Sequence, residues 1–426
     1  MKGAPPIILS VEEGESCGSK EVLGTRCWKM RVTTTMARCF PLAPLCLMLV
    51  TVQGESGNDP LKPWRGDVSI RPVARLPGRH TIHSYVNTCP ESPDGRWVLF
   101  YASTTPDSHH GELRILERAT GEEKVLARNI HTEDAHRAAC QQWSSRGRRV
   151  VYHDARDGEW VVAAVDVESG RERVLARNRQ LCWGQAHSDL VPIYGPHWRP
   201  GAHRDLELLN VETGEIQTAV TADAVRAEYP ELIAKLFGDK PISVFFPIIS
   251  PDLKRVFFKL ASPGGGDFRS PQASQRLGLV CYDLENKRFL FATANWGHPA
   301  WHPDSRTIVQ KGNCLIDSNT GSMRRIPGLP GFRSDHPTAS PDGKLVITDT
   351  TMEKFGGTEK EWGVALSDIR GQQHIILHRF DNSRGAKSWR RSHPHPVFSP
   401  DGRRIYFNVS SGEWTQLHVA EAAARH

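Results

Sequence analysis

The chain has 426 residues, of which 24% are charged and 38% are apolar, as in ordinary globular domains. The formal net charge is +6, and no basic block with interleaved aromatic residues is present. This argues against nucleic acid as a partner. A mildly basic chain with 19 histidines weakly favours an acidic substrate.

The first 60 residues differ from the rest of the chain. Residues 1–35 mix Gly, Pro, Cys and charges without periodicity. The segment Met36–Gly54 then holds a basic residue, a short apolar run and small residues at a cleavage position, which is typical of a signal peptide. We expect a mis-assigned start, an exported (periplasmic or secreted) protein and a single domain over residues 65–426. The alternative is a disordered extension with a chance apolar patch. The run is shorter than the roughly 20 residues of a membrane span, so we expect none.

The cysteines do not predict a disulfide framework. Four of the nine lie in the leading segment, and the other five are far apart and include no CxxC pair. This favours buried apolar roles for most of them, although one long-range disulfide stays open. The five are Cys89, Cys140, Cys182, Cys281 and Cys314.

A turn followed by a β-branched and aromatic run recurs seven times between Ser92 and Phe407. Full Ser-Pro-Asp-Gly copies begin at Ser92, Ser340 and Ser399. Pro pre-sets φ, Asp and Gly suit the turn, and the run after it reads as a strand. A second turn marker after most copies closes an outer hairpin, which gives four strands per unit. The period of about 40–60 residues is typical of propeller blades. The sequence therefore predicts an all-β, seven-bladed β-propeller with four-stranded antiparallel blades.

Two further elements complete this prediction. Residues 228–237 have a helical pattern and are expected to cap one face. A strand within residues 68–75 is expected to help close the ring next to the final strands.

Histidines stand just before the turn in three consecutive late repeats. His298, His336 and the pair His393 and His395 are expected to reach one mouth of the channel, because residues ahead of the turn belong to inner strands. His393 and His395 are two apart on a strand, so they are expected to share a face. With His336 they form a candidate three-imidazole site for a divalent metal. The alternative is a structural role, in which each imidazole bonds the backbone of a neighbouring blade. Histidines outside this register are interpreted as surface or structural residues, for example His136, His187 and His197.

These motifs resemble the oligogalacturonate lyases, seven-bladed propellers of pectin breakdown. The resemblance rests on "RSHPHPVFSPDG", "SDHPTASPDGKLVITD", "GHPAWHPDS" and "QRLGLVCYD", and it extends over about residues 75 to 420. The early blades match only in pattern. The His-Pro-His-Pro motif is fairly specific, whereas Ser-Pro-Asp-Gly blades also occur in TolB-like propellers.

The resemblance implies a manganese ion held by His336, His393 and His395. The family's fourth ligand, a Gln, would stand three residues before His393, where this chain has Arg390. Arg cannot ligate a cation, but it is a good bidentate partner for a carboxylate. Arg390 is therefore expected to bind substrate; otherwise the site has lost its metal.

The resemblance also implies catalytic residues. The family's base matches His298 and its catalytic arginine matches Arg276. Arg269, in the same loop, is a less well aligned alternative for that arginine and is expected to bind substrate. The implied reaction is β-elimination on short acidic oligosaccharides, the oligogalacturonides. Two alternatives stay open: a non-catalytic propeller of the TolB type that binds a protein or glycan, and a related lyase for another uronate.

Overall fold

The computed structural model describes residues 7–8, 59–326, 335–371 and 373–422. Of the chain's two units, the one formed by Met1–Ser10 and Pro60–His426 contains nearly all of these residues, and it alone is described below. The predicted signal peptide and start site lie outside the described residues. No helix within the described ranges is long and apolar enough to cross a bilayer.

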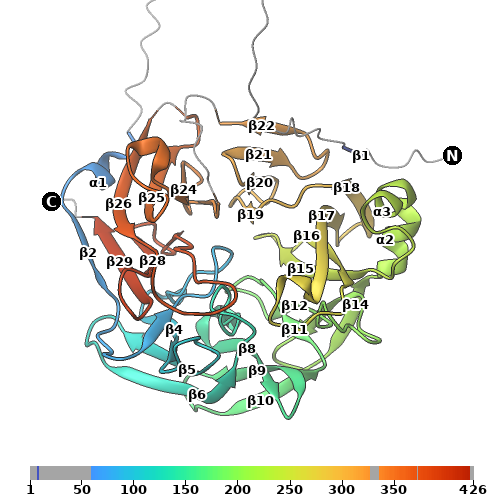
Figure 1. Cartoon of the computed structure of the whole chain (residues 1–426), viewed down its shortest axis with the longest axis horizontal. Coiled ribbons are helices and arrows are strands. Elements are labelled where there is room, and N and C mark those ends of the chain that lie inside the picture. Colours follow the sequence, from blue (N-terminus) through green and yellow to red (C-terminus); the bar gives the residue numbers. More distant parts are fainter. Residues whose placement is uncertain (1–6, 9–58, 327–334, 372, 423–426) are drawn as a thin grey trace, which may run out of the picture. The chain divides into compact units, whose positions relative to one another are not determined.

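The described strands form seven sheets with four blade strands each, arranged around one axis (Figure 1). Within each blade, neighbouring strands are antiparallel. This confirms the predicted seven-bladed β-propeller.

The first four blades follow the chain without interruption. Blade 1 contains β3 (His80–Ile82), β4 (Trp97–Ser103), β5 (His110–Glu117) and β6 (Glu123–His131). Blade 2 contains β7 (Gln142–Ser144), β8 (Arg149–Arg156), β9 (Glu159–Asp166) and β10 (Glu172–Arg177). Blade 3 contains β11 (Gln180–Leu181), β12 (Leu190–Tyr194), β13 (Leu206–Asn210) and β14 (Ile216–Val220). Blade 4 contains β15 (Ser243–Ile249), β16 (Arg255–Pro263), β17 (Ser274–Asp283) and β18 (Arg288–Thr293), beside which β1 (Ile7–Ile8) adds in parallel.

The last three blades complete the ring. Blade 5 contains β19 (Ala300–Trp301), β20 (Thr307–Gln310), β21 (Cys314–Asp317) and β22 (Met323–Arg325). Blade 6 contains β23 (Thr338–Ala339), β24 (Leu345–Thr351), β25 (Glu361–Asp368) and β26 (His374–Asp381). Blade 7 contains β27 (Val397–Phe398), β28 (Arg404–Val409), β29 (Gln416–Ala422) and, outermost, β2 (Val68–Pro72).

The Ser-Pro-Asp-Gly turn owes its recurrence to its own hydrogen bonds. In the related Ser-Pro-Asp turn at Ser250, the hydroxyl donates to Asp252 Oδ1 at 2.6 Å and accepts from the amide of Arg255 at 2.9 Å. The copies at Ser340 and Ser399 repeat both bonds. Because these bonds are local, the motif folds the same way in blade after blade.

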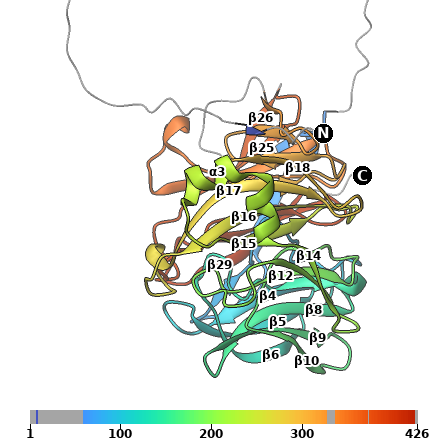
Figure 2. The same cartoon turned by 90° about the vertical axis from the view of Figure 1, so that its right-hand side faces the viewer.

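Two short helices connect blades 3 and 4. They are α2 (Ala222–Glu228), capped by the Thr221 hydroxyl, and α3 (Pro230–Phe237), so the helical prediction is confirmed. Their apolar side chains, Leu232 and Phe237 among them, share a buried cluster with β16 to β18. The helices therefore lie at the outer side of blade 4 (Figure 2) rather than across the channel. Four shorter helical turns are also present in the described ranges: α1 (Lys62–Arg65), η1 (Ser145–Gly147), η2 (Pro271–Ala273) and η3 (Glu353–Phe355).

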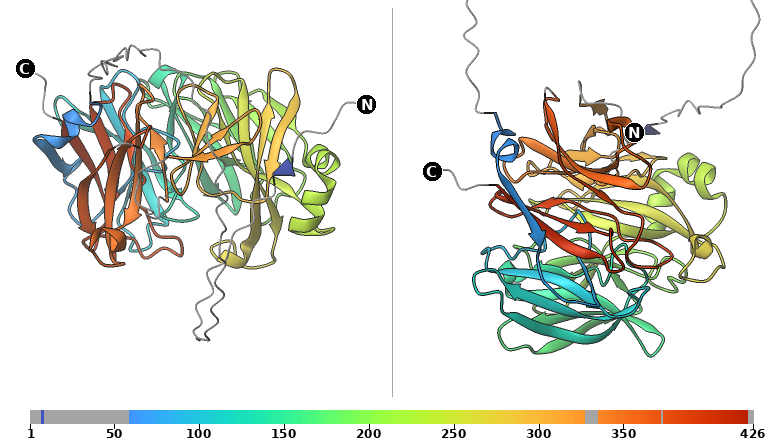
Figure 3. Two further views of the ribbon diagram at one scale, coloured as in Figure 1. Left: turned by 90° about the horizontal axis from the view of Figure 1, so that it is seen from above. Right: turned by 60° about the vertical axis from the view of Figure 1, so that its left-hand side comes forward.

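The ring is closed between the first and last parts of the domain. β2 pairs with β29 along its whole length, as the sequence predicted, and Figure 3 shows it beside the strands of blade 7. Blades 1 and 7 are also joined by a buried ion pair, in which Arg404 donates to both Glu91 oxygens at 2.7 and 2.8 Å. The Tyr406 hydroxyl donates to the same carboxylate.

Replacing Glu91 with Ala is expected to lower the free energy of unfolding by about 3 kcal/mol, because it leaves a buried guanidinium and a buried hydroxyl without this acceptor. Urea denaturation followed by circular dichroism measures the change. Glu159→Ala, which removes a surface partner of Arg177, is the control and is expected to change it by less than about 0.5 kcal/mol. Equal effects in the two variants contradict the role of Glu91 in closing the ring.

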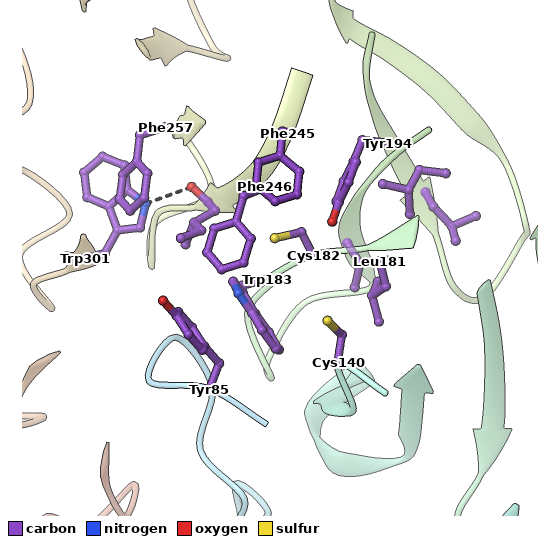
Figure 4. Close-up of a cluster of buried hydrophobic side chains, with 14 of the residues drawn as sticks. Tyr85, Cys140, Leu181, Cys182, Trp183, Tyr194, Phe245, Phe246, Phe257 and Trp301 are labelled. Atoms are coloured by element: carbon purple, nitrogen blue, oxygen red, sulfur yellow. Dashed lines mark hydrogen bonds between the residues drawn. The ribbon is translucent and has the colours of Figure 1, made fainter. Parts of the chain in front are cut away.

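The five cysteines of the propeller are free, and four of them are buried. Cys140 and Cys182 belong to the apolar cluster near the axis, with Trp183, Phe246 and Tyr85 (Figure 4). Tyr85 stacks on Trp183 and also meets the ring of His395 edge-on, at 4.6 Å between centroids. This cluster therefore ends directly against histidine side chains.

Candidate functional site

Four histidine rings form one cluster next to Tyr85. The rings of His336 and His395 lie 4.4 Å apart between centroids, and those of His336 and His393 lie 5.1 Å apart. His136 joins them from the segment between blades 1 and 2, with its ring 4.5 Å from that of His395. The three predicted metal ligands thus lie together. The fourth ring, His136, was not predicted, because it does not precede a repeat turn as the others do.

The backbone brings these rings together differently from the prediction. His336, His393 and His395 lie in the connections just before the inner strands β23 and β27, not on the strands. His395 adopts a left-handed φ of 45°, which is uncommon for a residue with a side chain and concentrates at functional sites. The prediction that His393 and His395 share a strand face is therefore wrong. Their ring centroids are 6.0 Å apart.

Fixed hydrogen bonds orient two of the rings. His336 Nδ1 lies 3.0 Å from Asp349 Oδ2, and the His336 backbone amide donates to the same carboxylate. His136 Nδ1 donates to the Arg391 carbonyl at 3.1 Å. Such outer partners are typical of metal-binding histidines, because they direct the opposite ring nitrogen toward the ion.

Burial keeps His136, His393 and His395 uncharged. Burial, together with the neighbouring His336, lowers the pKa of His393 to about 3. The pKa values of His136 and His395 are also lowered well below the ordinary value, again mainly by burial. Several ring nitrogens find no hydrogen-bond partner in the described part of the chain: His136 Nε2, His393 Nδ1 and both nitrogens of His395. Neutral imidazoles with unused buried nitrogens fit a divalent transition metal.

A cavity of about 460 Å³ opens beside the cluster. No carboxylate is among its lining residues, and three cationic side chains are: Lys259, Arg276 and Arg390. Aromatic rings form much of the remaining wall, and these belong to Tyr85, Phe245, Phe246, Trp296 and Trp389. His136 and His298 also line it. A cavity with this lining favours an anionic ligand that has flat apolar faces.

Two of the three cationic side chains have no carboxylate partner within the described part of the protein. Neither Lys259 nor Arg276 forms a salt bridge with a described residue, and both face aromatic rings. Burial, together with the charges of Arg276 and Arg390, lowers the pKa of Lys259 to about 7. Burial and Arg390 lower the pKa of Arg276 to about 10. A bound anion would relieve both effects.

His298 lies at the junction of cavity and cluster. Its Nδ1 donates to the Asp335 carbonyl at 2.9 Å, so Nε2 carries the lone pair. Its ring stacks on that of His336, with centroids 4.4 Å apart. The preceding Gly297 has a φ of 69°, and a Cβ there would lie 2.2 Å from the Gln310 side chain. Gly297 thus lets Gln310 accept from the His298 amide at 2.9 Å.

The two remaining predicted residues have different surroundings. Arg390 lines the cavity and lies 3.6 Å from Asp134 Oδ2. Arg269 donates to the Thr132 carbonyl at 2.9 Å and covers the Phe268 ring, and it is not among the lining residues. Its substrate-binding role stays a prediction.

A buried network supports the wall of the cavity. Glu133 accepts from Arg137 at 2.7 Å and from His197 Nε2 at 3.2 Å. His197 Nδ1 then accepts from the Ser274 hydroxyl at 2.6 Å. Burial alone would raise the pKa of Glu133, but Arg137 and His197 hold it below its ordinary value. The ionised carboxylate thus fixes His197, which the sequence had suggested to be structural, and through it the Ser274 side of the cavity.

Comparisons with known proteins support the fold. No family model matches this chain, and no curated protein sequence matches it either. A solved oligogalacturonate lyase in complex with manganese has a TM-score of 0.58 and 16% identity, over 83% of this chain and 93% of that chain. The oligogalacturonate lyase of Vibrio parahaemolyticus has a TM-score of 0.59 and 14% identity, over 84% and 94%. At these identities the likeness shows that this chain is similar in fold to oligogalacturonate lyases.

Proposed function

We propose that this chain is a lyase that cleaves short uronate oligosaccharides, such as oligogalacturonides, by β-elimination. The observation that carries the proposal is the shared location of three elements. A carboxylate-free cavity lined by cations, an imidazole with an available nitrogen and a buried histidine cluster lie side by side. The neighbouring structures, which are oligogalacturonate lyases, support this choice.

The chemistry requires these elements. The C5 proton of a uronate lies α to an anionic carboxylate and is difficult to remove unless that negative charge is neutralised. His298 Nε2 would accept the proton, the C4–O bond would break, and a C4=C5 double bond would form. The leaving oxygen would take a proton from solvent or from the protonated His298. Arg276 would bind the charge that develops on the carboxylate.

The histidine cluster would hold the metal. His336, His393 and His395 would bind a divalent ion, for which Mn²⁺ is the precedent in the neighbouring structure. His393 belongs to two groups of converging ligand atoms, one with His136 and His395 and one with His336 and Asp349. When bound, such an ion supplies a Lewis acid for the uronate carboxylate, a contribution on the order of several kcal/mol. Arg390, which lines the cavity, would contact a substrate carboxylate, and the tryptophan rings would contact the sugar faces.

The direct test is ultraviolet absorbance of the unsaturated product. Purified full-length chain is incubated with digalacturonate and with oligomers of other uronates, without added metal, with Mn²⁺ and with Zn²⁺. Product from digalacturonate supports the proposal as stated. Product from another uronate alone assigns a related lyase, and no product from any oligomer overturns the lyase function in favour of a binding propeller.

Lys259 predicts a pH dependence. An anionic substrate favours its protonated form, and the groups facing it are the cations Arg276 and Arg390 and the Trp296 ring. As pH rises through about 7, the free enzyme loses this proton, so KM is expected to rise by up to about tenfold per pH unit. Steady-state kinetics between pH 6 and 9 measures the profile. In Lys259→Arg, which stays charged, KM is expected to be flat over this range. An unchanged slope in this variant contradicts the assignment.

A further inference from the structure

His136 reaches the cluster from a part of the chain remote from the other three histidines. It lies between β6 and β7, in a segment with buried anchors. The backbone amide of Ala135 donates to Ser388 Oγ at 3.1 Å, and that of Arg137 donates to Asp134 Oδ1 at 2.9 Å. The Arg137 side chain is in turn held by Glu133. The position of His136 is therefore fixed on both sides along the chain.

The geometry of His136 is that of a ligand. One ring nitrogen each of His136, His393 and His395 lie within 4.8 Å of one another. The His136 ring is 4.9 Å from that of His393 and 4.5 Å from that of His395, which is closer than those two are to each other. Its Nδ1 is taken by the Arg391 carbonyl. Its Nε2 is buried and has no hydrogen-bond partner among the residues that the structure describes.

The ligand that the sequence resemblance implies at position 390 is absent. Arg390 has no lone pair to give a metal, and its side chain lies along the cavity, near Asp134 and the Trp389 ring. A metal in this cluster thus has no amide oxygen from this position. His136 offers an imidazole nitrogen to the same group of rings.

We propose that His136 is the fourth protein ligand of a metal site completed by His336, His393 and His395, and that this all-imidazole set selects Zn²⁺ over Mn²⁺. Imidazole suits zinc and its neighbours in the first transition row, whereas manganese is better served by oxygen ligands. Exchanging an amide oxygen for an imidazole therefore moves the preference toward zinc. The inference rests on the metal part of the proposed function, not on the elimination reaction.

The test measures binding, not turnover. Full-length protein is stripped with a chelator, and the affinities for Zn²⁺ and Mn²⁺ are measured by competition titration, with bound metal counted by elemental analysis. Wild type is expected to bind one Zn²⁺ tightly and Mn²⁺ much more weakly. His136→Gln is expected to weaken Zn²⁺ binding at least tenfold and to narrow the ratio between the two affinities. The exposed His187, changed to Gln, is the control and should change neither.

Two further measurements keep the outcomes distinct. Co²⁺ as a spectroscopic probe should give a visible absorption spectrum that changes in His136→Gln, and melting of the metal-free proteins checks that the variant is folded. If that variant does not fold, His136→Asn takes its place. An unchanged Zn²⁺/Mn²⁺ ratio in the variant, together with lost binding in His395→Gln, overturns the role of His136. Absence of metal from wild type overturns the whole inference, whereas the ultraviolet assay separately decides whether the chain is a lyase.

Discussion

Replacing His298 with Ala is expected to lower kcat on digalacturonate by roughly 10²- to 10⁴-fold, the range that a positioned general base provides. KM is expected to change little, because the cationic side chains of the cavity remain. The structural reason is that Nδ1 is fixed on the Asp335 carbonyl, so Nε2 is the nitrogen that can accept the C5 proton. Ultraviolet detection of the unsaturated product measures both constants.

Added imidazole offers a second test of the same role. It is expected to restore part of the activity of His298→Ala, because the truncated side chain leaves room beside the cavity for a free base. Wild type should not respond. His302→Ala is a matched control, since that residue begins the turn between β19 and β20 and its ring bonds the Gly343 carbonyl at 3.1 Å. A His298→Ala variant with wild-type kcat contradicts the assignment and places the base elsewhere.

Replacing Arg276 with Ala is expected to lower kcat by about 10²- to 10³-fold, the typical effect of removing one donor aimed at developing charge. Arg276 lies at the cavity wall between the Phe245 and Trp389 rings, without a salt bridge to any residue in the described ranges. Its charge is therefore not offset by a paired carboxylate. Its loss should lower kcat more than it raises KM.

The control for Arg276 lies on the neighbouring strand. Arg288, on β18, is exposed and forms a long surface ion pair of 3.8 Å with Asp283. Arg288→Ala is therefore expected to leave kcat and KM unchanged. Arg276→Lys separates charge from shape: it should recover part of kcat, but not all of it, because an ammonium lacks the two-pronged geometry of a guanidinium. A large rise in KM with an unchanged kcat would assign Arg276 to ground-state binding instead.

The fold was predictable because its main signal is local. In the Ser-Pro-Asp-Gly turns at Ser340 and Ser399, the serine hydroxyl bonds groups of the same turn, so the turn forms without help from distant residues. The strands after it then define blades, and seven copies of the turn predict seven blades. Even the pairing of β2 with β29 followed, since a ring needs its last blade completed.

The site was predictable only in part. Histidines in register with the turn, such as His336, could be found because the repeat fixes their place. His136 lies in a connection between blades and has no register, so only the folded chain shows it among the other rings. Lys259 left a weak signal, as a lone charge between Phe258 and Leu260 in an apolar strand. The left-handed backbone of His395 could not be predicted, because the rule that side chains alternate along a strand assumes an extended backbone.

Closure by the pairing of β2 with β29 has a consequence for synthesis. His136 is translated long before His393 and His395, and the rings meet only when blade 7 has folded against blade 1. A nascent chain that lacks its last thirty or so residues holds the early histidine but not the strands that bring the late ones to it. Uptake of the proposed metal would therefore follow translation, because an incomplete chain would lack the complete set of histidines. Bound metal would therefore indicate that the propeller ring is complete.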